Sequence, residues 1–257
     1  MSMSKHVPSF RLDGEVAFVT GGGSGLGRAV CLTFAEAGAS VVVVDIDESR
    51  AQAVADEIGA KALALQANVT DEKSVNSAVE RAVDRFGRVD VLFNNAGINR
   101  RAPTTDLELG DWNSVLAVNT TGMFITAKAV ARIMKAKGTR GRIINTASVL
   151  GMSGGFYPNI AYQASKGAVV NMTRSWAIEW AEFGIRVNAI APGMVRTPFT
   201  ENITTQPELV KKLEALTPMR RLGETDDITG PVLFLATAAS SFVTGHILPI
   251  DGGMLAQ

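Results

Sequence analysis

The fold is decided by residues 16–27, which read VAFVTGGGSGLG. Residues 16–20 are apolar or β-branched, as in a buried strand, and the amphipathic pattern of a helix begins at Gly25. Between them, glycines permit positive φ angles and a close approach of the backbone to a ligand. A glycine-rich stretch alone can be a plain turn. Its place between a strand and a helix N-terminus, whose free N–H groups bind phosphate, predicts a dinucleotide-binding loop.

The same alternation of short apolar runs and amphipathic segments continues along the chain. Strands are predicted at Val16–Thr20, Ser40–Asp45, Ala62–Ala67, Val89–Asn94, Arg142–Thr146, Arg186–Ala191 and His246–Ile250. Helices are predicted at Gly25–Ala37, Ser49–Ile58, Ser74–Phe86, Trp112–Met134, Ala161–Ala181 and Thr225–Leu235. We therefore expect an α/β fold: a Rossmann-like, doubly wound sheet of seven parallel strands with helices on both faces.

One domain is expected over residues 1–257, because no linker, internal repeat or low-complexity tract interrupts the pattern. Residues 1–11 precede the first strand as an N-terminal tail. Residues 194–221 break the rhythm, since they contain three prolines and only a short helical stretch at Glu208–Leu216. A long connection of this kind often covers a ligand, so we expect a substrate lid there.

The composition excludes several classes of protein. The 25 Lys and Arg residues balance 25 Asp and Glu residues, whereas nucleic-acid-binding domains carry a basic excess. One cysteine, Cys31, and two histidines are too few soft ligands for a structural zinc site. Residues 1–8 lack the apolar core of a signal peptide. The longest purely aliphatic run, Val41–Val44, is far shorter than the roughly 20 residues of a membrane-spanning helix. We expect a cytoplasmic protein with neither a nucleic-acid nor a membrane partner.

Asp45 ends the second predicted strand, at the edge of the sheet where the glycine loop also lies. A carboxylate there accepts hydrogen bonds from the adenosine ribose hydroxyls and repels a 2′-phosphate, so NAD is favoured over NADP. The alternative is that Asp45 only caps the turn to the next helix. Asp47 is a weaker candidate for the ribose, because it lies beyond the strand end.

Four polar residues form a candidate catalytic group. Tyr162 and Lys166 are four residues apart in a predicted helix and project from one face, although this spacing also arises by chance. A phenol has an ordinary pKa of about 10 and needs a nearby positive charge to act as a base at neutral pH. Ser148 lies just after the fifth strand, and we prefer it to Ser153 as the hydroxyl that binds the reacting oxygen. Asn119 lies in an apolar helix, where an unpaired amide is costly.

Together these motifs resemble the short-chain dehydrogenase/reductase family. The spacing Gly21-x3-Gly25-x-Gly27 is similar to that family's TGxxxGxG loop, and the tetrapeptide 94–97 matches its strand-end motif. The candidate catalytic group matches the family's tetrad in order and context. The resemblance covers residues 12–253. It implies hydride transfer between a secondary alcohol and a nicotinamide cofactor, without a metal, in a homotetramer.

The resemblance also assigns roles to single residues. Tyr162 is the general base, Ser148 orients the oxygen, Lys166 lowers the pKa of Tyr162 and binds the nicotinamide ribose, and Asn119 holds a water that passes the proton on. The implied cofactor-binding residues are Gly21, Ser24, Gly25, Leu26, Gly27, Asp45, Asn68, Val69, Asn95, Ala96, Gly97, Tyr162, Lys166, Pro192, Gly193, Val195 and Thr197. One of them departs from the family, because Asn68 stands where Asp usually meets the adenine amino group.

Arg100 and Arg101 follow the fourth strand, where open parallel sheets bind ligands, and are candidate substrate residues together with Ser148 and Tyr162. Two guanidinium groups can clamp a carboxylate. Alternatively, they form ion pairs with the acidic residues Asp106, Glu108 and Asp111. The stretch 94–101 resembles the branch of the family that acts on sugar acids, including gluconate 5-dehydrogenases and 2-dehydro-3-deoxygluconate 5-dehydrogenases. Sugars and polyols remain alternative substrates.

Two other functions compete with this hypothesis. A 3-oxoacyl thioester reductase, acting on an acyl carrier protein, usually runs on NADP, against which Asp45 argues. Lys128, Arg132 and Lys135 nevertheless form a basic helical stripe that can meet an acidic carrier. A nucleotide-binding scaffold without turnover is the alternative outside enzymology. Such a protein is expected to lack a tetrad residue, and the sequence keeps all four.

Overall fold

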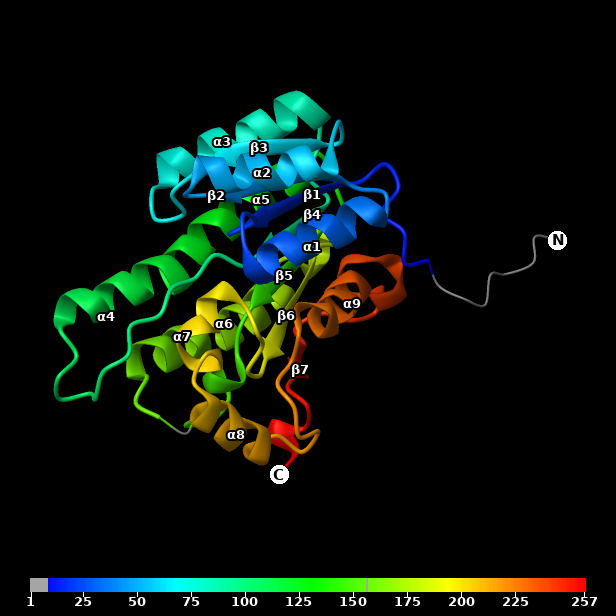
Figure 1. The fold of residues 1–257 in the computed structure, drawn as a ribbon. Helices are drawn as coiled ribbons and strands as arrows, with labels where there is room; N and C mark the ends of the chain where they lie inside the picture. Colours follow the sequence, from blue (N-terminus) through cyan, green and yellow to red (C-terminus); the bar gives the residue numbers. More distant parts are fainter. Residues whose placement is uncertain (1–8, 156) are drawn as a thin grey trace.

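A sheet of seven parallel strands forms the centre of the computed structural model, which describes residues 9–155 and 157–257 (Figure 1). Its order is β3-β2-β1-β4-β5-β6-β7. The strands are β1 (Val16–Thr20), β2 (Ser40–Asp45), β3 (Ala62–Gln66), β4 (Val91–Asn94), β5 (Arg142–Thr146), β6 (Arg186–Pro192) and β7 (Ile247–Ile250). The strand order changes direction between β1 and β4: β2 and β3 lie on one side of β1, and β4 and the later strands lie on the other. Such sheets bind ligands at this switch point. The predicted fold class is confirmed. Residues 1–8 of the predicted tail lie outside the described residues.

Helices cover both faces of the sheet (Figure 1). One face carries α1 (Gly25–Glu36), α2 (Glu48–Ile58) and α9 (Thr225–Ala236). The other face carries α3 (Glu72–Phe86), α5 (Met123–Ala136) and α6 (Ile160–Glu179). All five residues of β1 are buried, because helices lie on both sides of this strand. This explains why the sequence of the central strands is continuously apolar rather than alternating.

One long predicted helix contains a local irregularity. Where Trp112–Met134 was expected as a regular helix, the structure has α4 (Leu109–Leu116), a π-helical turn at Ala117–Gly122 and then α5. A π turn inserts one extra residue into the helix and rotates the side chains around it. Asn119 lies within this turn and is buried.

The helical stretch Leu109–Ala136 is long and apolar enough, by length and composition alone, to cross a membrane. Because it contains no long run of purely aliphatic residues, this stretch was not predicted as a possible membrane helix from the sequence. However, 56% of its most apolar window is buried inside the protein. There Ile125, Val130 and Met134 belong to the core between α3, α6 and the sheet. Part of the apolar surface of this stretch therefore belongs to the protein core.

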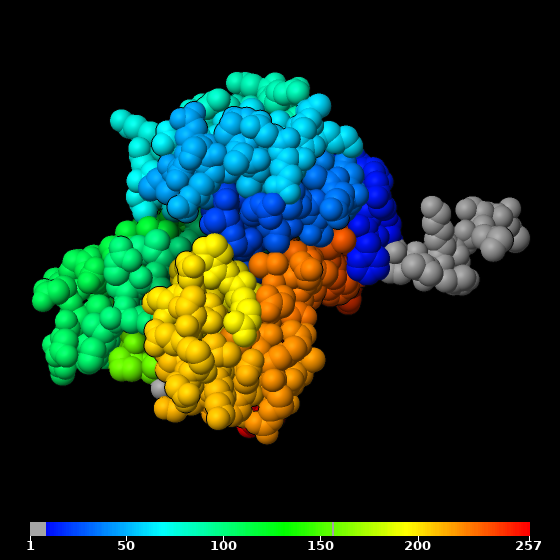
Figure 2. All heavy atoms as spheres, in the orientation of Figure 1, coloured from blue at the N-terminus to red at the C-terminus, as the bar shows by residue number. Residues whose placement is uncertain are grey.

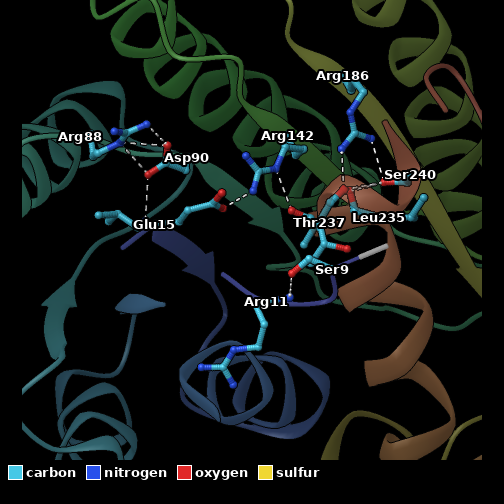
Figure 3. A network of polar contacts seen from close by, with 12 residues as sticks. Ser9, Arg11, Glu15, Arg88, Asp90, Arg142, Arg186, Leu235, Thr237 and Ser240 are labelled. Atoms are coloured by element: carbon cyan, nitrogen blue, oxygen red, sulfur yellow. Dashed lines mark hydrogen bonds and ion pairs between the residues drawn. The ribbon is translucent and has the colours of Figure 1, made fainter. Parts of the chain in front are cut away.

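A network of polar side chains lies at the end of the sheet formed by the amino ends of the strands (Figure 3). Arg142, the first residue of β5, pairs with Glu15 and donates a 2.7 Å hydrogen bond to the carbonyl oxygen of Ala236. Arg186, the first residue of β6, donates a 3.0 Å bond to the carbonyl oxygen of Thr237. Burial lowers the pKa of Arg186 to about 10, so it keeps its charge at neutral pH. The network fastens the end of α9 to the sheet, at the edge opposite the strand ends that carry the candidate site.

Residues 194–221 form much of the lobe at the lower end of the molecule in Figures 1 and 2. This segment contains α7 (Glu201–Thr204) and α8 (Pro207–Leu216). Ile203, Leu213 and Leu222 form a small core of their own. A bridge between Val195 and Gly223 fastens the two ends of the segment together. The predicted lid is thus a folded lobe next to the carboxyl end of β6, and its role as a lid stays a prediction.

Candidate active site

The glycine loop after β1 leaves its backbone open to a ligand. Gly21 has φ of 63°, and a Cβ placed on Gly27 would lie 1.9 Å from the carbonyl oxygen of Gly21. Ser24 is the N-cap residue of α1, yet its side chain makes no capping hydrogen bond with the described residues. The first N–H groups of α1 therefore remain available. An open helix N-terminus beside closely approachable backbone fits a pyrophosphate.

Asn95 connects three strand ends. Its backbone N–H donates to the Thr20 hydroxyl at 2.9 Å, and its side-chain Nδ2 donates to the Thr20 carbonyl oxygen at 3.2 Å. Its Oδ1 accepts a 3.2 Å hydrogen bond from the Thr146 hydroxyl. The carboxyl ends of β1, β4 and β5 are therefore held together directly beside the glycine loop.

Asp45 and Asp47 have different surroundings. The carboxylate of Asp45 accepts hydrogen bonds from the backbone N–H groups of Gly23 (3.0 Å) and Asp47 (3.1 Å), and it lines the main cavity. Asp47 instead caps α2, because it accepts from the N–H groups of Ser49 and Arg50. Asp45 does organise the turn, as the alternative held. It also presents its carboxylate to the cavity, which Asp47 does not.

Asn68 lines the same cavity beside Val69, but its side-chain oxygen is already engaged. Oδ1 accepts hydrogen bonds from both the backbone N–H (3.0 Å) and the hydroxyl (2.9 Å) of Thr70. A carbonyl oxygen has two lone pairs, so this atom has little capacity left for an adenine amino group. A contact between Asn68 and adenine stays a prediction.

The main cavity has a volume of about 410 Å³ and follows the carboxyl ends of the strands. This size is within the usual range for cofactor sites. It brings together most of the predicted residues: Gly21, Ser24, Gly25, Leu26, Asp45, Asn68, Val69, Asn95, Ala96, Gly97, Ser148, Tyr162, Lys166, Pro192, Gly193, Val195 and Thr197. Gly27, Asn119, Arg100 and Arg101 do not line it.

Ser148, Tyr162 and Lys166 converge at one end of this cavity. Lys166 Nζ lies 5.5 Å from the centroid of the Tyr162 ring and donates a 2.6 Å hydrogen bond to the carbonyl oxygen of Thr146. Ser153, the competing hydroxyl, is exposed and donates to the carbonyl oxygen of Val149. The preference for Ser148 therefore agrees with the geometry.

Burial is the largest influence on the pKa values of Tyr162 and Lys166. It raises the pKa of Tyr162 well above its ordinary value, while a hydrogen bond with Ser148 and the charge of Arg101 act in the opposite direction. It lowers the pKa of Lys166 to about 8. Tyr162 is therefore a neutral phenol at neutral pH until a positive charge is placed beside it. The lowering of its pKa by Lys166 stays a prediction.

Asn119 lies behind the cavity rather than on its wall. Its Oδ1 accepts from the backbone N–H of Ile98 at 2.8 Å, and its Nδ2 donates to the Ile98 carbonyl oxygen at 2.9 Å and to the Ser165 hydroxyl at 3.1 Å. The buried amide is thus fully paired, as its cost in an apolar helix requires. These bonds fix the loop after β4 against α6, and a role for Asn119 in proton transfer stays a prediction.

Phe199, which the sequence did not suggest, covers Tyr162 from the 194–221 segment. The centroids of the two rings are 6.0 Å apart. Nearby, a Cβ on Gly193, just after β6, would lie 3.0 Å from Cα of Asp251, so a larger residue there would require Asp251 to shift. The missed lining residues also include Ile46, Arg50 and Thr200. Their signal was weak, because each lies one or a few residues beyond a recognised motif.

A second hollow, of about 60 Å³, adjoins the main cavity at Ser148 and Tyr162. Arg101 lines it. The guanidinium carbon of Arg101 is 5.3 Å from the Tyr157 ring centroid, and its Nε is buried without a hydrogen-bond partner in the described part of the chain. Arg100 is exposed and pairs with Asp111 at 3.4 Å. The structure thus separates the two arginines: one faces the site, and the other forms the alternative ion pair.

Comparisons with known proteins agree with this geometry. Residues 21–255 match the family model described as enoyl-(acyl carrier protein) reductase. The chain belongs to the short-chain dehydrogenase/reductase family. The resemblance identified from the sequence is therefore confirmed. As a member, this dehydrogenase is a nucleotide-dependent oxidoreductase that acts on CH–OH groups of small molecules.

Its relatives cover nearly the whole chain. It is 43% identical to galactitol 2-dehydrogenase (L-tagatose-forming) of Cereibacter sphaeroides, over 95% of this chain and 96% of the relative. It is 39% identical to a 3-oxoacyl-(acyl-carrier-protein) reductase of Thermotoga maritima, over 95% and 99%. The solved structure of a gluconate 5-dehydrogenase from Burkholderia cenocepacia, in complex with NADP and tartrate, is 38% identical with a TM-score of 0.93, over 97% and 98%.

Proposed function

We propose that this dehydrogenase oxidises a secondary alcohol of a sugar acid, sugar or polyol with NAD, or catalyses the reverse reduction. The observation that carries the proposal is the hollow beside Tyr162, whose lining includes buried polar groups without a described partner. Arg101 presents an unpaired Nε there, among the residues that the structure describes, and Asn99 presents an unpaired Oδ1. An anionic or heavily hydroxylated substrate can pair these groups, whereas an alkyl chain would leave them buried and unpaired.

The chain's own residues divide the reaction between them. Tyr162 accepts the hydroxyl proton in oxidation and returns it in reduction, and Ser148 orients the reacting oxygen beside it. Lys166, held by Thr146, supplies positive charge and binds the ribose of the nicotinamide nucleoside. The bound nicotinamide supplies the hydride acceptor and, when oxidised, the positive charge that favours phenolate. General base catalysis of this kind contributes about 10²–10⁴-fold, and positioning supplies much of the rest.

The proposed cofactor preference is for NAD over NADP. Asp45 lines the cavity next to Gly23 and Ile46, where a 2′-phosphate would meet its charge. Arg50 is the nearest basic residue in the lining, but its Nε pairs with Asp47 at 3.2 Å. A gluconate 5-dehydrogenase of similar structure binds NADP, so the preference requires a direct measurement.

The test is a panel assay of NADH formation at equal subsaturating concentrations. The panel contains galactitol, D-gluconate and other polyols and aldonates, with acetoacetyl thioester reduction as the comparison. We expect kcat/KM to be highest for an aldonate or polyol, with NAD. A higher kcat/KM for the thioester, with NADPH, would overturn the proposal.

Relatives favour one second candidate function, a 3-oxoacyl thioester reductase. The basic stripe proposed to meet an acidic carrier is partly engaged within the chain. Lys128 pairs with Glu72 at 2.6 Å, and Lys135 Nζ lies 3.7 Å from the centroid of the Phe183 ring. Within the described residues, only Lys128 of the stripe is thus paired with an acidic residue, while Lys135 keeps its charge, so the stripe alone does not decide between the two functions.

A cytoplasmic homotetramer without a membrane partner is the proposed state of the enzyme. Apolar side chains are exposed on the outer helices, among them Leu109, Phe124 and Ile178, the last with 82% of its surface accessible. β7 is the edge strand of the sheet and offers a second surface. Subunit contacts would bury these exposed apolar side chains. Light scattering behind a sizing column tests the assembly, and a monomer would contradict it.

A further inference from the structure

Asn159 is a buried amide for which the described residues offer no hydrogen-bond partner. The residue is 2% exposed, and both Nδ2 and Oδ1 are unpaired. The large majority of buried polar side chains are paired, because an unpaired amide in the interior costs free energy. The amide of Asn159 therefore calls for a partner that the described residues do not supply.

Asn159 also occupies a position where asparagine usually forms a helix-capping hydrogen bond, but its side chain forms no such bond with the described residues. It is the N-cap residue of α6, a position at which asparagine usually accepts a bond from the first turn of the helix. Asp47 and Asp71 do this at the starts of α2 and α3. Asn159 makes no side-chain cap bond with any residue that the structure describes. Its amide thus serves neither its own helix nor a described neighbour.

The position of Asn159 points to a ligand. It lies three residues before Tyr162 and lines the small hollow that Ser148 and Tyr162 share with the main cavity. Asn99 Oδ1 and Arg101 Nε, which also lack partners in the described structure, belong to residues of the same hollow. Donors and acceptors without described partners therefore gather in the hollow beside Tyr162, outside the main cavity.

We propose that the amide of Asn159 binds a second hydroxyl of the substrate, close to the reacting carbon, and so selects hydroxylated substrates over simple alcohols; this rests on the proposed function. An amide suits a hydroxyl because its NH₂ donates and its carbonyl accepts, and a hydroxyl does both. A guanidinium has donors only, so Arg101 suits a carboxylate instead. In a hydroxy acid, Asn159 would thus bind the hydroxyl and Arg101 the carboxylate.

Binding of tartrate and succinate to the NADH-loaded enzyme tests this division, with calorimetry as the readout. Both probes carry two carboxylates, and only tartrate carries hydroxyl groups. We expect wild type to bind tartrate more tightly than succinate. Asn159→Leu and Asn159→Ala should weaken tartrate binding by about tenfold or more, because one buried hydrogen bond is lost. They should leave the affinity for succinate unchanged. Arg101→Ala should weaken both probes equally.

The outcomes separate the claims. Equal binding of the two probes by wild type would overturn the proposal, and so would Asn159 variants that keep the tartrate preference or weaken both probes alike. Tm controls for folding, because Asn159→Leu removes a buried unpaired amide and should hold or raise Tm. Asn159→Ala serves as the second variant if leucine proves too large. If tartrate binds through Asn159 but no sugar acid, sugar or polyol is oxidised, the proposed function fails while the hydroxyl site stands.

Discussion

The ammonium group of Lys166 donates a 2.6 Å hydrogen bond to the main-chain carbonyl oxygen of Thr146, the last residue of β5. This bond joins α6 to the sheet edge that carries Ser148. Tyr162, one helical turn earlier, is thereby held at a fixed place relative to Ser148. The reacting end of the cavity is thus built by one helix and one strand, and its precision depends on the contact between them.

Lys166→Ala should impair both cofactor binding and turnover, because Lys166 supplies charge near Tyr162 and a donor for the ribose. We expect at least about a tenfold loss in each, equivalent to roughly 1.4 kcal/mol. Fluorescence titration with NADH measures the first effect, and kcat at saturating NAD the second. Lys73→Ala, an exposed lysine on α3, is the matched control and should change neither. An effect on only one of the two quantities would remove one of the assigned roles.

Oxidation of the alcohol should become faster as the pH rises. Burial raises the pKa of Tyr162, so the phenol is protonated at neutral pH and must lose its proton to act as the base. We expect initial oxidation rates at saturating NAD to increase above about pH 7, until Lys166, whose pKa burial lowers to about 8, loses the positive charge that favours phenolate. The reverse reduction, in which the phenol donates its proton, should stay level or decline over this range. An oxidation rate that falls steadily with pH would contradict the role of Tyr162 as the base.

Asp45→Ala should shift cofactor preference toward NADP. The change removes hydrogen bonds to the ribose of NAD and the repulsion of a 2′-phosphate, so the ratio of kcat/KM for NAD to that for NADP should fall by about tenfold or more. Glu48→Ala removes an exposed charge from the first turn of α2 and should leave the ratio unchanged. A wild-type enzyme already faster with NADP would refute the NAD preference, as would an unchanged ratio in Asp45→Ala.

Arg101→Ala should reduce the advantage of an aldonate over its neutral polyol analogue, and Arg100→Ala should not. Only Arg101 lines the hollow beside Tyr162, whereas Arg100 pairs with Asp111 in solvent. A charge-assisted bond is worth about 1.5–3 kcal/mol, so the acid-to-alcohol ratio of kcat/KM should fall by roughly tenfold to a hundredfold. Added salt should weaken the aldonate's advantage only partly, because the site is shielded. The sugar-acid specificity loses its physical basis if both variants keep the wild-type ratio.

The ends of the strands could be predicted from sequence because parallel strands place their carboxyl ends at one edge of the sheet. Asp45, Asn95 and Ser148 each lie at or just beyond the end of a predicted strand, and all three line the main cavity. The strands β1, β2 and β5 agree with their predicted bounds, since continuous burial leaves a clear apolar signal.

Other features have no periodic signal. Arg100 and Arg101 are adjacent in sequence, and only the path of the loop decides which one turns inward. The π turn around Asn119 adds a single residue to a helix whose apolar pattern continues through it. Asn159 stands at a helix start, where asparagine is ordinary. Its missing cap bond is visible only in three dimensions.

The measurement that tests the account most directly is NADH formation by Tyr162→Phe with the best substrate of the panel, together with its affinity for NAD. The variant loses only the phenolic oxygen, so NAD should bind as in wild type while kcat falls by more than tenfold, or over about 1.4 kcal/mol of barrier. Tyr157 is the other of the chain's two tyrosines, and Tyr157→Phe, which changes the residue facing Arg101, should keep most of its kcat. If Tyr162→Phe retained more than about a tenth of wild-type kcat, Tyr162 would not be the base and the proposed mechanism would be wrong.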